Sequence, residues 1–283
     1  MNQVEVEVLE TSLFPPALSD NVVVICSNIG LHSYSVTANV QNRSSEHAVM
    51  ATSSTGLFYV YAKNINDDWS YRYLITFATR DVADTWWRLV TDSVVGGYAR
   101  FKSVQRVTSQ FYTHNPGEGN IPDTITDPKV AQSLRGKIFF TLLNDRDGRI
   151  LSVIPVQNWV DRSSGDRFYI RSSSDPSLYW YYNGSRVVAS RDRRTRFTVT
   201  IADRKRAPGT IMIGDDEVFI SVGSSTNIGV ANQQDQLSAS DNPFPFKLSA
   251  LNNDFQIDYY LEGKMTEGFV TRNPGKGEGW ELV

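Results

Sequence analysis

The sequence contains few of the residues that build disulfide frameworks and metal centres. It has one cysteine, Cys26, and three histidines, His32, His47 and His114, in 283 residues. A single cysteine cannot form an internal disulfide, and the apolar run around Cys26 predicts a buried, unreactive thiol. The histidines are dispersed without metal-ligand spacing, and we expect His114 in a solvated loop. The sequence therefore predicts no metal site and no cofactor.

Signatures of catalysis are absent as well. The chain has no phosphate-binding glycine loop, no dinucleotide fingerprint and no Gly-x-Ser-x-Gly elbow. Asp145 and Asp147 precede Gly148 in a segment typical of a turn between strands, which favours turn chemistry over catalysis. We assign no catalytic residue. The sequence leaves enzymatic activity open and favours a protein without it.

Long apolar runs and a strong charge of one sign are also missing. No run reaches the roughly 18 apolar residues that a membrane-spanning helix needs. The first eight residues lack the basic and apolar regions of a signal peptide. The formal net charge is -3 at pH 7, so nothing global indicates a nucleic-acid partner. We expect a soluble, cytoplasmic protein with no membrane span, which would leave the cell only by a non-classical route.

Strand-forming residues dominate what is present. Aromatic side chains make up 12% of the chain, and β-branched or aromatic runs alternate with polar breaks from residue 21 to about residue 77. The spacing then becomes helical. Thr79 offers an N-cap, and we expect a helix over residues 81–94 with Trp86 in the core. We expect Trp87 to pack on a second domain.

The strand Tyr73–Phe77 leading into Trp86 resembles the end of a pleckstrin-homology-like domain. In that family a final strand passes into a helix whose tryptophan closes a barrel. The resemblance implies a small α+β domain at residues 1–97 that ends with the helix. Residues 98–135 include a Gly/Pro/Asp-rich stretch and predict a connecting segment that packs on both sides.

The second half contains an internal repeat. Residues 168–200 and 218–249 read as copies of one another, with strands and polar turns in the same order. Asp192 and Asp241 stand at matching points, each five residues before a matching phenylalanine, Phe197 or Phe246. Repeats of this length built from short strands predict a pseudo-symmetric all-β module.

Together with a strand at residues 137–143 and the terminal Trp280, this repeat resembles the β-trefoil superfamily, which includes ricin-B-like lectins and fascin-like domains. The Gln-x-Trp signature of ricin-type modules occurs once, at residues 157–159, where three would be expected. The resemblance implies a mainly β fold class with a β-trefoil-like domain at residues 136–283. An immunoglobulin-like or jelly-roll sandwich is the alternative. The whole chain also resembles proteins of mushroom-forming fungi, a resemblance that implies no activity.

One aromatic stretch of the first copy contains the ingredients of a sugar site. Sugars bind to an aromatic face together with amides or carboxylates for their hydroxyls. Alternation along a strand accounts for two of the four aromatics at residues 179–182 as core residues and leaves two for water or a ligand. The candidate ligand-binding residues are Asp175, Tyr179, Trp180, Tyr181, Asn183, Asn158 and Trp159.

A basic turn follows that stretch. Between Arg186 and Arg206 there are eight basic residues and two acidic ones, an excess suited to contacts with acidic glycans, phosphate groups or RNA. We favour the alternative, a solvated turn with salt bridges to the acidic residues at 215–217, because the basic residues alternate with core positions and no aromatic stacking platform accompanies them. The candidate basic patch consists of Arg191, Arg193, Arg194 and Arg196.

Three hypotheses of function follow from the sequence. The first is a non-catalytic, lectin-like protein whose partners are glycans, with no nucleic acid bound. The second is a scaffold that binds proteins or anionic membranes through the basic turn Arg186–Arg206. The third is a hydrolase with a site between the domains. A homodimer is one hypothesis for the assembly of the chain.

Overall fold

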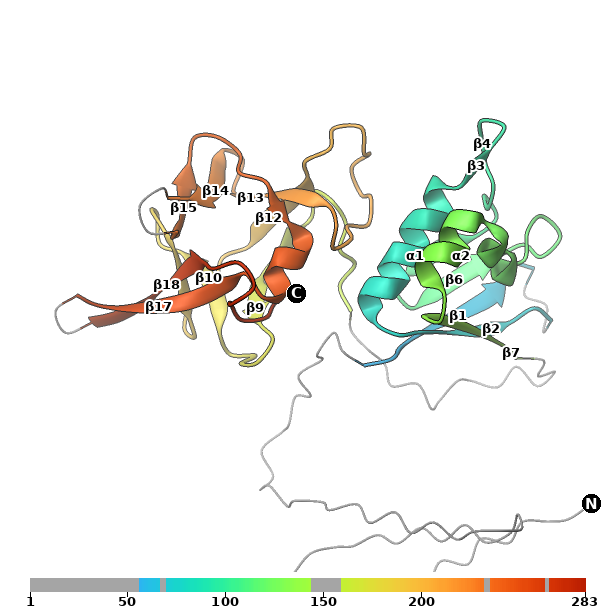
Figure 1. Cartoon of the computed structure of the whole chain (residues 1–283), viewed down its shortest axis with the longest axis horizontal. Helices are drawn as coiled ribbons and strands as arrows, with labels where there is room; N and C mark the ends of the chain where they lie inside the picture. Colours follow the sequence, from blue (N-terminus) through green and yellow to red (C-terminus); the bar gives the residue numbers. More distant parts are fainter. Residues whose placement is uncertain (1–55, 67–69, 144–158, 232–234, 263–264) are drawn as a thin grey trace, which may run out of the picture. The chain divides into compact units, whose positions relative to one another are not determined.

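The computed structural model describes residues 56–66, 70–143, 159–231, 235–262 and 265–283. The described part is mostly β (Figure 1). Of the features discussed above, the strands predicted between residues 21 and 55 lie outside it, as do Cys26, His32, His47, Asp145, Asp147, Gly148 and Asn158. Among the described residues, no helix has the length and apolar character needed to cross a membrane.

The first described strands form a five-stranded sheet. In spatial order these are β5 (Gln105–Thr108), β6 (Phe111–His114), β1 (Phe58–Asn64), β2 (Tyr73–Phe77) and β7 (Ile138–Leu142). The pairing of β1 with β6 is parallel, and the other pairings are antiparallel. Strand β1 alternates buried and half-buried side chains, because one face of the sheet packs against α1 (Arg80–Asp92) and α2 (Pro128–Leu134) (Figure 1).

Helix α1 begins and ends close to the predicted positions. Thr79 is its N-cap, and the Thr79 hydroxyl accepts a hydrogen bond from the Val82 amide at 3.3 Å. Trp86 is fully buried, as predicted, and its indole N–H donates to Thr124 Oγ1 at 3.1 Å. Trp87 is half-buried and packs against the core of the same sheet, where its ring lies 5.4 Å from that of Tyr112.

The segment predicted to connect two domains is part of this sheet. It supplies β5, β6, the 3-10 helix η1 (Ile121–Thr126) and α2, whose N-cap Asp127 accepts from the Lys129 amide at 2.8 Å. The strand at 137–143 does not open the C-terminal repeats, because β7 pairs with β2 along its full length. Three strands of the sheet therefore follow α1, and the helix is not the last element.

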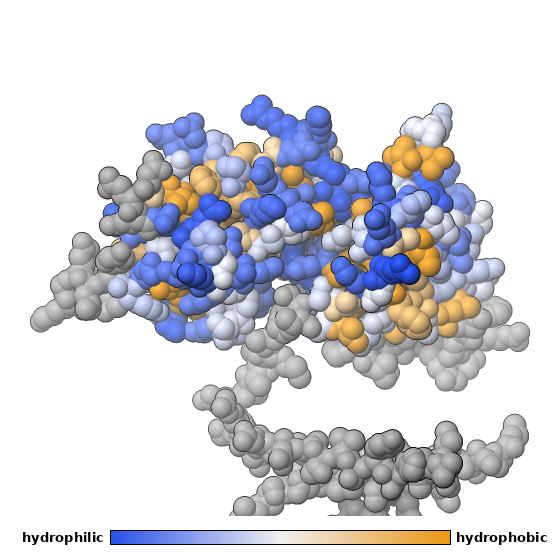
Figure 2. Space-filling view, viewed as in Figure 1, coloured by the Kyte–Doolittle hydropathy of each residue, from blue (hydrophilic) through white to orange (hydrophobic). Residues whose placement is uncertain are grey.

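A short hairpin follows α1. Its strands are β3 (Val94–Val95) and β4 (Tyr98–Ala99). Val94, Val95 and Tyr98 are exposed there, and apolar side chains gather at this hairpin in Figure 2.

Buried charges link α1 to β5. Asp84 Oδ1 pairs with Arg106 Nη2 at 3.0 Å, and Asp84 Oδ2 lies 3.6 Å from Arg80 Nε. Arg106 also donates to the Tyr112 hydroxyl at 2.9 Å and to Asp161 at 2.6 Å. Burial lowers the pKa of Arg80 to about 10. The carboxylate of Asp84 thus lies between two buried arginines.

His114 is fully buried rather than solvated, which corrects the sequence expectation. Its Nδ1 accepts from the Ile121 amide at 3.3 Å, and its Nε2 lies 2.8 Å from the Tyr71 carbonyl oxygen. Nε2 is therefore the protonated nitrogen of a neutral ring. Burial lowers the pKa of His114.

Short strands form the C-terminal part of the chain. They are β8 (Arg167–Phe168), β9 (Ile170–Ser172), β10 (Tyr179–Tyr182), β11 (Val187–Ser190), β12 (Phe197–Ile201), β13 (Glu217–Val222), β14 (Thr226–Val230), β15 (Leu237–Ser240), β16 (Phe246–Lys247), β17 (Phe255–Glu262), β18 (Met265–Arg272) and β19 (Trp280–Leu282). A 3-10 helix, η2 (Leu248–Asn252), follows β16. Strands β8 to β12 contain the first sequence copy and β13 to β16 the second in the same order, with β8 and β9 together corresponding to β13. Phe197 and Phe246 are buried at equivalent positions, whereas Asp192 and Asp241 are exposed.

The pairing of these strands repeats as well. Strand β12 pairs with both β8 and β13, and β13 pairs in turn with β16. Three hairpins, β10–β11, β14–β15 and β17–β18, touch one another pairwise through single bridges or short ladders. The contacts join β11 to β18, Arg186 to Ser238 and Gln236 to Thr271. Strand β19, the last of the chain, pairs with β9, which closes the arrangement between its two ends.

Aromatic rings fill the core of this part. The Trp180 ring lies 5.1 Å from Phe255, 5.7 Å from Trp280 and 6.0 Å from Phe197. Trp180 is fully buried, so its assignment as a ligand-binding residue was wrong. It belongs to the apolar cluster that holds the repeated strands together.

Candidate functional site

Strand β10 directs two tyrosines outward. Trp180 points into the core, so its neighbours Tyr179 and Tyr181 lie on the opposite face and are half-buried. Tyr179 stands opposite Arg171 of β9, and Arg171 stands opposite Glu281 of β19. Neighbouring strands therefore place these side chains in one row.

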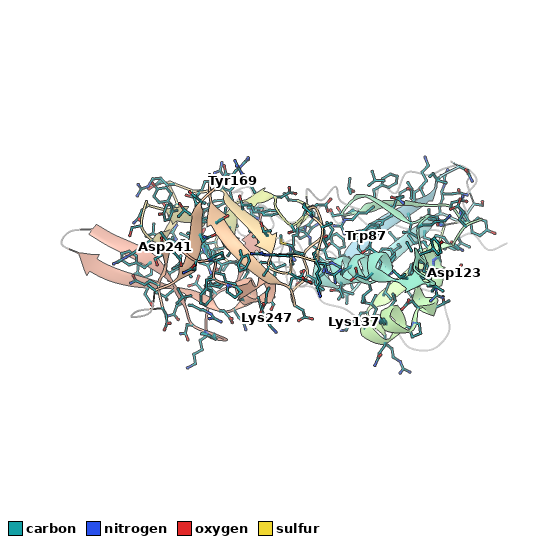
Figure 3. The ribbon with its side chains drawn as sticks, turned by 90° about the horizontal axis from the view of Figure 1, so that it is seen from above. Trp87, Asp123, Lys137, Tyr169, Asp241 and Lys247 are labelled. Atoms are coloured by element: carbon teal, nitrogen blue, oxygen red, sulfur yellow. The ribbon has the colours of Figure 1, made fainter. Side chains whose placement is uncertain are left out.

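A third tyrosine joins them from the link between β8 and β9. The Tyr169 amide donates to the Val283 carbonyl at 2.8 Å, and the Val283 amide donates to the Tyr169 carbonyl at 3.0 Å. These two bonds fix the backbone at Tyr169, and its ring lies 6.2 Å from that of Tyr179 in an edge-on arrangement. Figure 3 labels Tyr169 among the C-terminal strands.

The arginine-rich segment at residues 191–196 is tied to β10 by its threonine. The Thr195 amide donates to the Trp180 carbonyl at 3.1 Å, and the Thr195 hydroxyl accepts from the Tyr182 amide at 2.9 Å. The Ser190 hydroxyl accepts from the Arg193 amide at 3.1 Å and shapes the turn before it. Thr195 thus holds the flanking arginines beside the outward tyrosines.

Three of these arginines lie over the tyrosine rings. Arg193 Cζ is 4.3 Å from the Tyr181 centroid, and Arg194 Cζ is 4.5 Å from Tyr169 and 5.4 Å from Tyr179. Arg196 Cζ is 5.0 Å from Tyr169. We call this set the tyrosine–arginine surface: Tyr169, Tyr179, Tyr181, Arg193, Arg194 and Arg196. No carboxylate of the described residues forms an ion pair with any of its three arginines.

Two ion pairs border this surface. Arg171 donates twice to Glu281 Oε1, at 3.0 and 2.6 Å, and Arg191 pairs with Asp175 at 2.8 Å. The pKa of Asp175 is lowered, first by the hydrogen bond from the Ser177 hydroxyl and further by Arg191. The bordering carboxylates are therefore already neutralised by arginines outside the surface.

The structure brings together residues that the sequence assigned to two separate sites. Tyr179, Tyr181 and Asp175 were predicted to bind sugar, and the arginines to form a basic patch. Through Thr195 and the β10–β11 hairpin they form one surface with its border. Asp216 pairs with Arg88 of α1 at 2.8 Å, and Arg206 of the basic turn pairs with Asp92 of the same helix at 2.6 Å, so neither of these ion pairs joins the basic turn to residues 215–217.

Other predicted ligand residues lie elsewhere. The Asn183 side-chain oxygen accepts from the Ser185 and Arg186 amides, which makes it a turn residue. Trp159 packs its ring 5.8 Å from that of Phe58, with the Arg80 guanidinium 4.9 Å from it. Neither residue contributes to the tyrosine–arginine surface.

Sequence reasoning missed Tyr169, Arg171 and Glu281. Tyr169 and Arg171 alternate with buried Phe168 and Ile170, a period-two pattern that marks an outward face. That pattern could have identified the two residues. No sequence signal places Glu281 beside Arg171, because their contact depends on the pairing of β19 with β9.

Chemically, the surface offers positive charge with fixed orientation. A guanidinium held over an aromatic ring loses less side-chain freedom on binding and keeps N–H donors for an anion. The same contacts occupy the tyrosine faces on which a neutral sugar would stack. Among the described residues no group of three or more His, Cys, Asp or Glu side chains could hold a metal ion. The arrangement therefore suits an anionic ligand.

The second sequence copy has no equivalent surface. Strand β14, the counterpart of β10, has the sequence Thr-Asn-Ile-Gly-Val without an aromatic residue.

Comparison of the chain with protein-family models, with curated proteins and with solved structures finds no match.

Proposed function

We propose that this chain is a non-catalytic, lectin-like protein that binds acidic glycans at the tyrosine–arginine surface. One observation carries the proposal: Arg193, Arg194 and Arg196 lie over tyrosine rings and have no carboxylate partner among the described residues. An acidic sugar supplies the missing negative charge. Its hydroxyls would meet the tyrosine hydroxyls and the polar side chains at the border.

The architecture we propose for residues 163–283 is a β-trefoil. Two four-strand copies, a third hairpin at β17–β18 and pairwise contacts among the three hairpins support it. The closing pair of β9 with β19 also supports it. A pleckstrin-homology-like N-terminal domain is not part of this proposal, because three strands follow α1 in the same sheet.

A glycan array tests the proposed function. The purified, folded chain should bind acidic glycans above neutral glycans of the same backbone. The Arg193→Gln, Arg194→Gln and Arg196→Gln triple variant should lose this preference. No binding above background by folded wild-type chain would refute the proposal.

A second candidate function is an anionic membrane or protein scaffold. It is favoured by the continuation of the basic turn to exposed Arg204 and Lys205, which lie beyond the tyrosine–arginine surface. Flotation with anionic liposomes at low and moderate salt separates the two functions, because an electrostatic membrane binder responds steeply to salt. A lectin should leave the liposomes unbound. No described contact favours the hydrolase hypothesis.

A further inference from the structure

Two arginines of the surface share one ring. Arg194 Cζ and Arg196 Cζ lie 4.5 and 5.0 Å from the Tyr169 centroid, so the two carbons are less than about 10 Å apart. That separation is within one Debye length at 0.1 M salt, about 10 Å, so the two charges repel each other. A group that accepts hydrogen bonds from both guanidiniums would relieve this repulsion.

The acidic groups near this pair do not provide that relief. Glu281 is engaged by Arg171 through two hydrogen bonds, and Asp175 is engaged by Arg191. Asp192 is exposed and forms no ion pair with a described residue. The positive pair at Tyr169 is therefore available to an external anion.

The number of oxygens on that anion distinguishes its chemical class. A carboxylate has two oxygens, which one guanidinium fork can fully occupy. A sulfate or phosphate monoester has three terminal oxygens and can accept from two guanidiniums at once. The two guanidiniums beside the Tyr169 ring therefore match a tetrahedral sulfate or phosphate better than a planar carboxylate.

We propose that Arg194 and Arg196, held by Tyr169, form a subsite for a sulfate or phosphate monoester group carried on a sugar. This inference rests on the proposed function and adds a selectivity to it: the site prefers tetrahedral ester groups to the carboxylates of uronic acids. Arg193 over Tyr181 supplies positive charge along the rest of the glycan.

The test compares matched ligands on the full chain. Affinity is measured by calorimetry for a sulfated glycosaminoglycan oligosaccharide and for the same oligosaccharide after chemical desulfation, which keeps its carboxylates. A phosphorylated oligosaccharide and vesicles of phosphatidylcholine with phosphatidic acid separate a sugar-borne group from a lipid headgroup. We expect at least about tenfold tighter binding of the sulfated or the phosphorylated oligosaccharide than of the desulfated one, equivalent to one charge-assisted hydrogen bond.

Two variants of equal charge locate the effect. Arg194→Gln with Arg196→Gln should reduce binding of the ester-bearing oligosaccharide at least about tenfold, to the level of the desulfated one. Arg204→Gln with Lys205→Gln removes the same net charge from exposed residues outside the surface and should change affinity less than about threefold. Tyr169→Phe keeps the ring that holds the two guanidiniums and should therefore retain the preference for the ester-bearing oligosaccharide over the desulfated one. Circular dichroism verifies that each variant is folded.

Each outcome has one meaning. Equal affinity for the sulfated and desulfated ligands overturns the subsite while leaving acidic-glycan binding intact. Equal losses in the two double variants overturn it too, because net charge alone would then explain binding. Binding to vesicles but to none of the oligosaccharides overturns both this inference and the proposed function. A loss confined to Arg194→Gln with Arg196→Gln and to ester-bearing ligands supports the subsite.

Discussion

Replacing Asp84 by asparagine should destabilise the fold by about 3 kcal/mol. Asp84 is buried and its carboxylate lies between Arg106, at 3.0 Å, and Arg80, at 3.6 Å. Breaking a buried ion pair by removing one partner costs about 3–5 kcal/mol, because the other charge stays buried without compensation. The low end applies here, since Arg106 keeps the partly exposed Asp161 at 2.6 Å. Asparagine has nearly the shape of aspartate, so the substitution removes the negative charge and leaves the volume of the side chain almost unchanged.

The assay is urea unfolding followed by tryptophan fluorescence, with a linear extrapolation of the free energy of unfolding to water. A loss of about 3 kcal/mol corresponds to a Tm lower by roughly 6–12 °C for a domain of 150–250 residues. Asp92→Asn on the same helix is the matched control. Asp92 pairs with Arg206 but is 39% exposed, so its removal should cost less than about 1 kcal/mol.

A double-mutant cycle isolates the pair. Asp84→Asn, Arg106→Met and their combination should give a coupling energy of at least about 2 kcal/mol, because the second replacement removes the charge that the first leaves uncompensated. If Asp84→Asn costs no more than Asp92→Asn, the reasoning about buried charge is wrong.

Three further predictions concern the core, a buried histidine and the anchor of the site. Trp180→Ala should cost about 3–5 kcal/mol of stability, whereas Tyr181→Ala should cost less than about 1 kcal/mol and weaken glycan binding; similar stabilities in urea would contradict the burial of Trp180. Because burial lowers the pKa of His114 below its unfolded value of 6.5, unfolding takes up a proton at mildly acidic pH, so stability should fall as the pH drops below 6.5. His114→Gln should flatten the Tm profile between pH 7.5 and 5, and an unchanged slope would exclude His114 as its source. Thr195→Val leaves the Tyr182 amide without its acceptor and should cost about 1–3 kcal/mol and reduce glycan affinity, while Thr195→Ser should retain both properties.

Local signals predicted local structure well. Thr79 and the helical spacing after it located α1 to within two residues, and Trp86 lies in the core as expected. The Asp127-Pro128 start of α2 is an equally local signal that was overlooked. The sequence copies correspond to strands in matching order because each copy contains its own turns and apolar periodicity.

Pairings between distant segments were not predictable in this way. Strand β7 carries the same β-branched and aromatic pattern whether it pairs with β2 or begins a repeat, so only the ladder distinguishes these alternatives. His114 was misread because its partners, Tyr71 and Ile121, come from other segments. The arginines and two of the tyrosines were identified as candidates from the sequence. Their placement on one surface depends on two hydrogen bonds of Thr195, which composition cannot reveal.

The pairing of β9 with β19 links ligand binding to the folding of the C-terminal strands. Tyr169 is held by the backbone of Val283, and Arg171 by Glu281, so the site forms only when segments more than a hundred residues apart in sequence have met. A ligand that binds there favours the closed arrangement over the unfolded chain by mass action, by about 2.7 kcal/mol at a hundredfold excess over Kd. Ligand binding should therefore raise the melting temperature of the chain. A thermal-shift screen of acidic sugars could identify the ligand without a label.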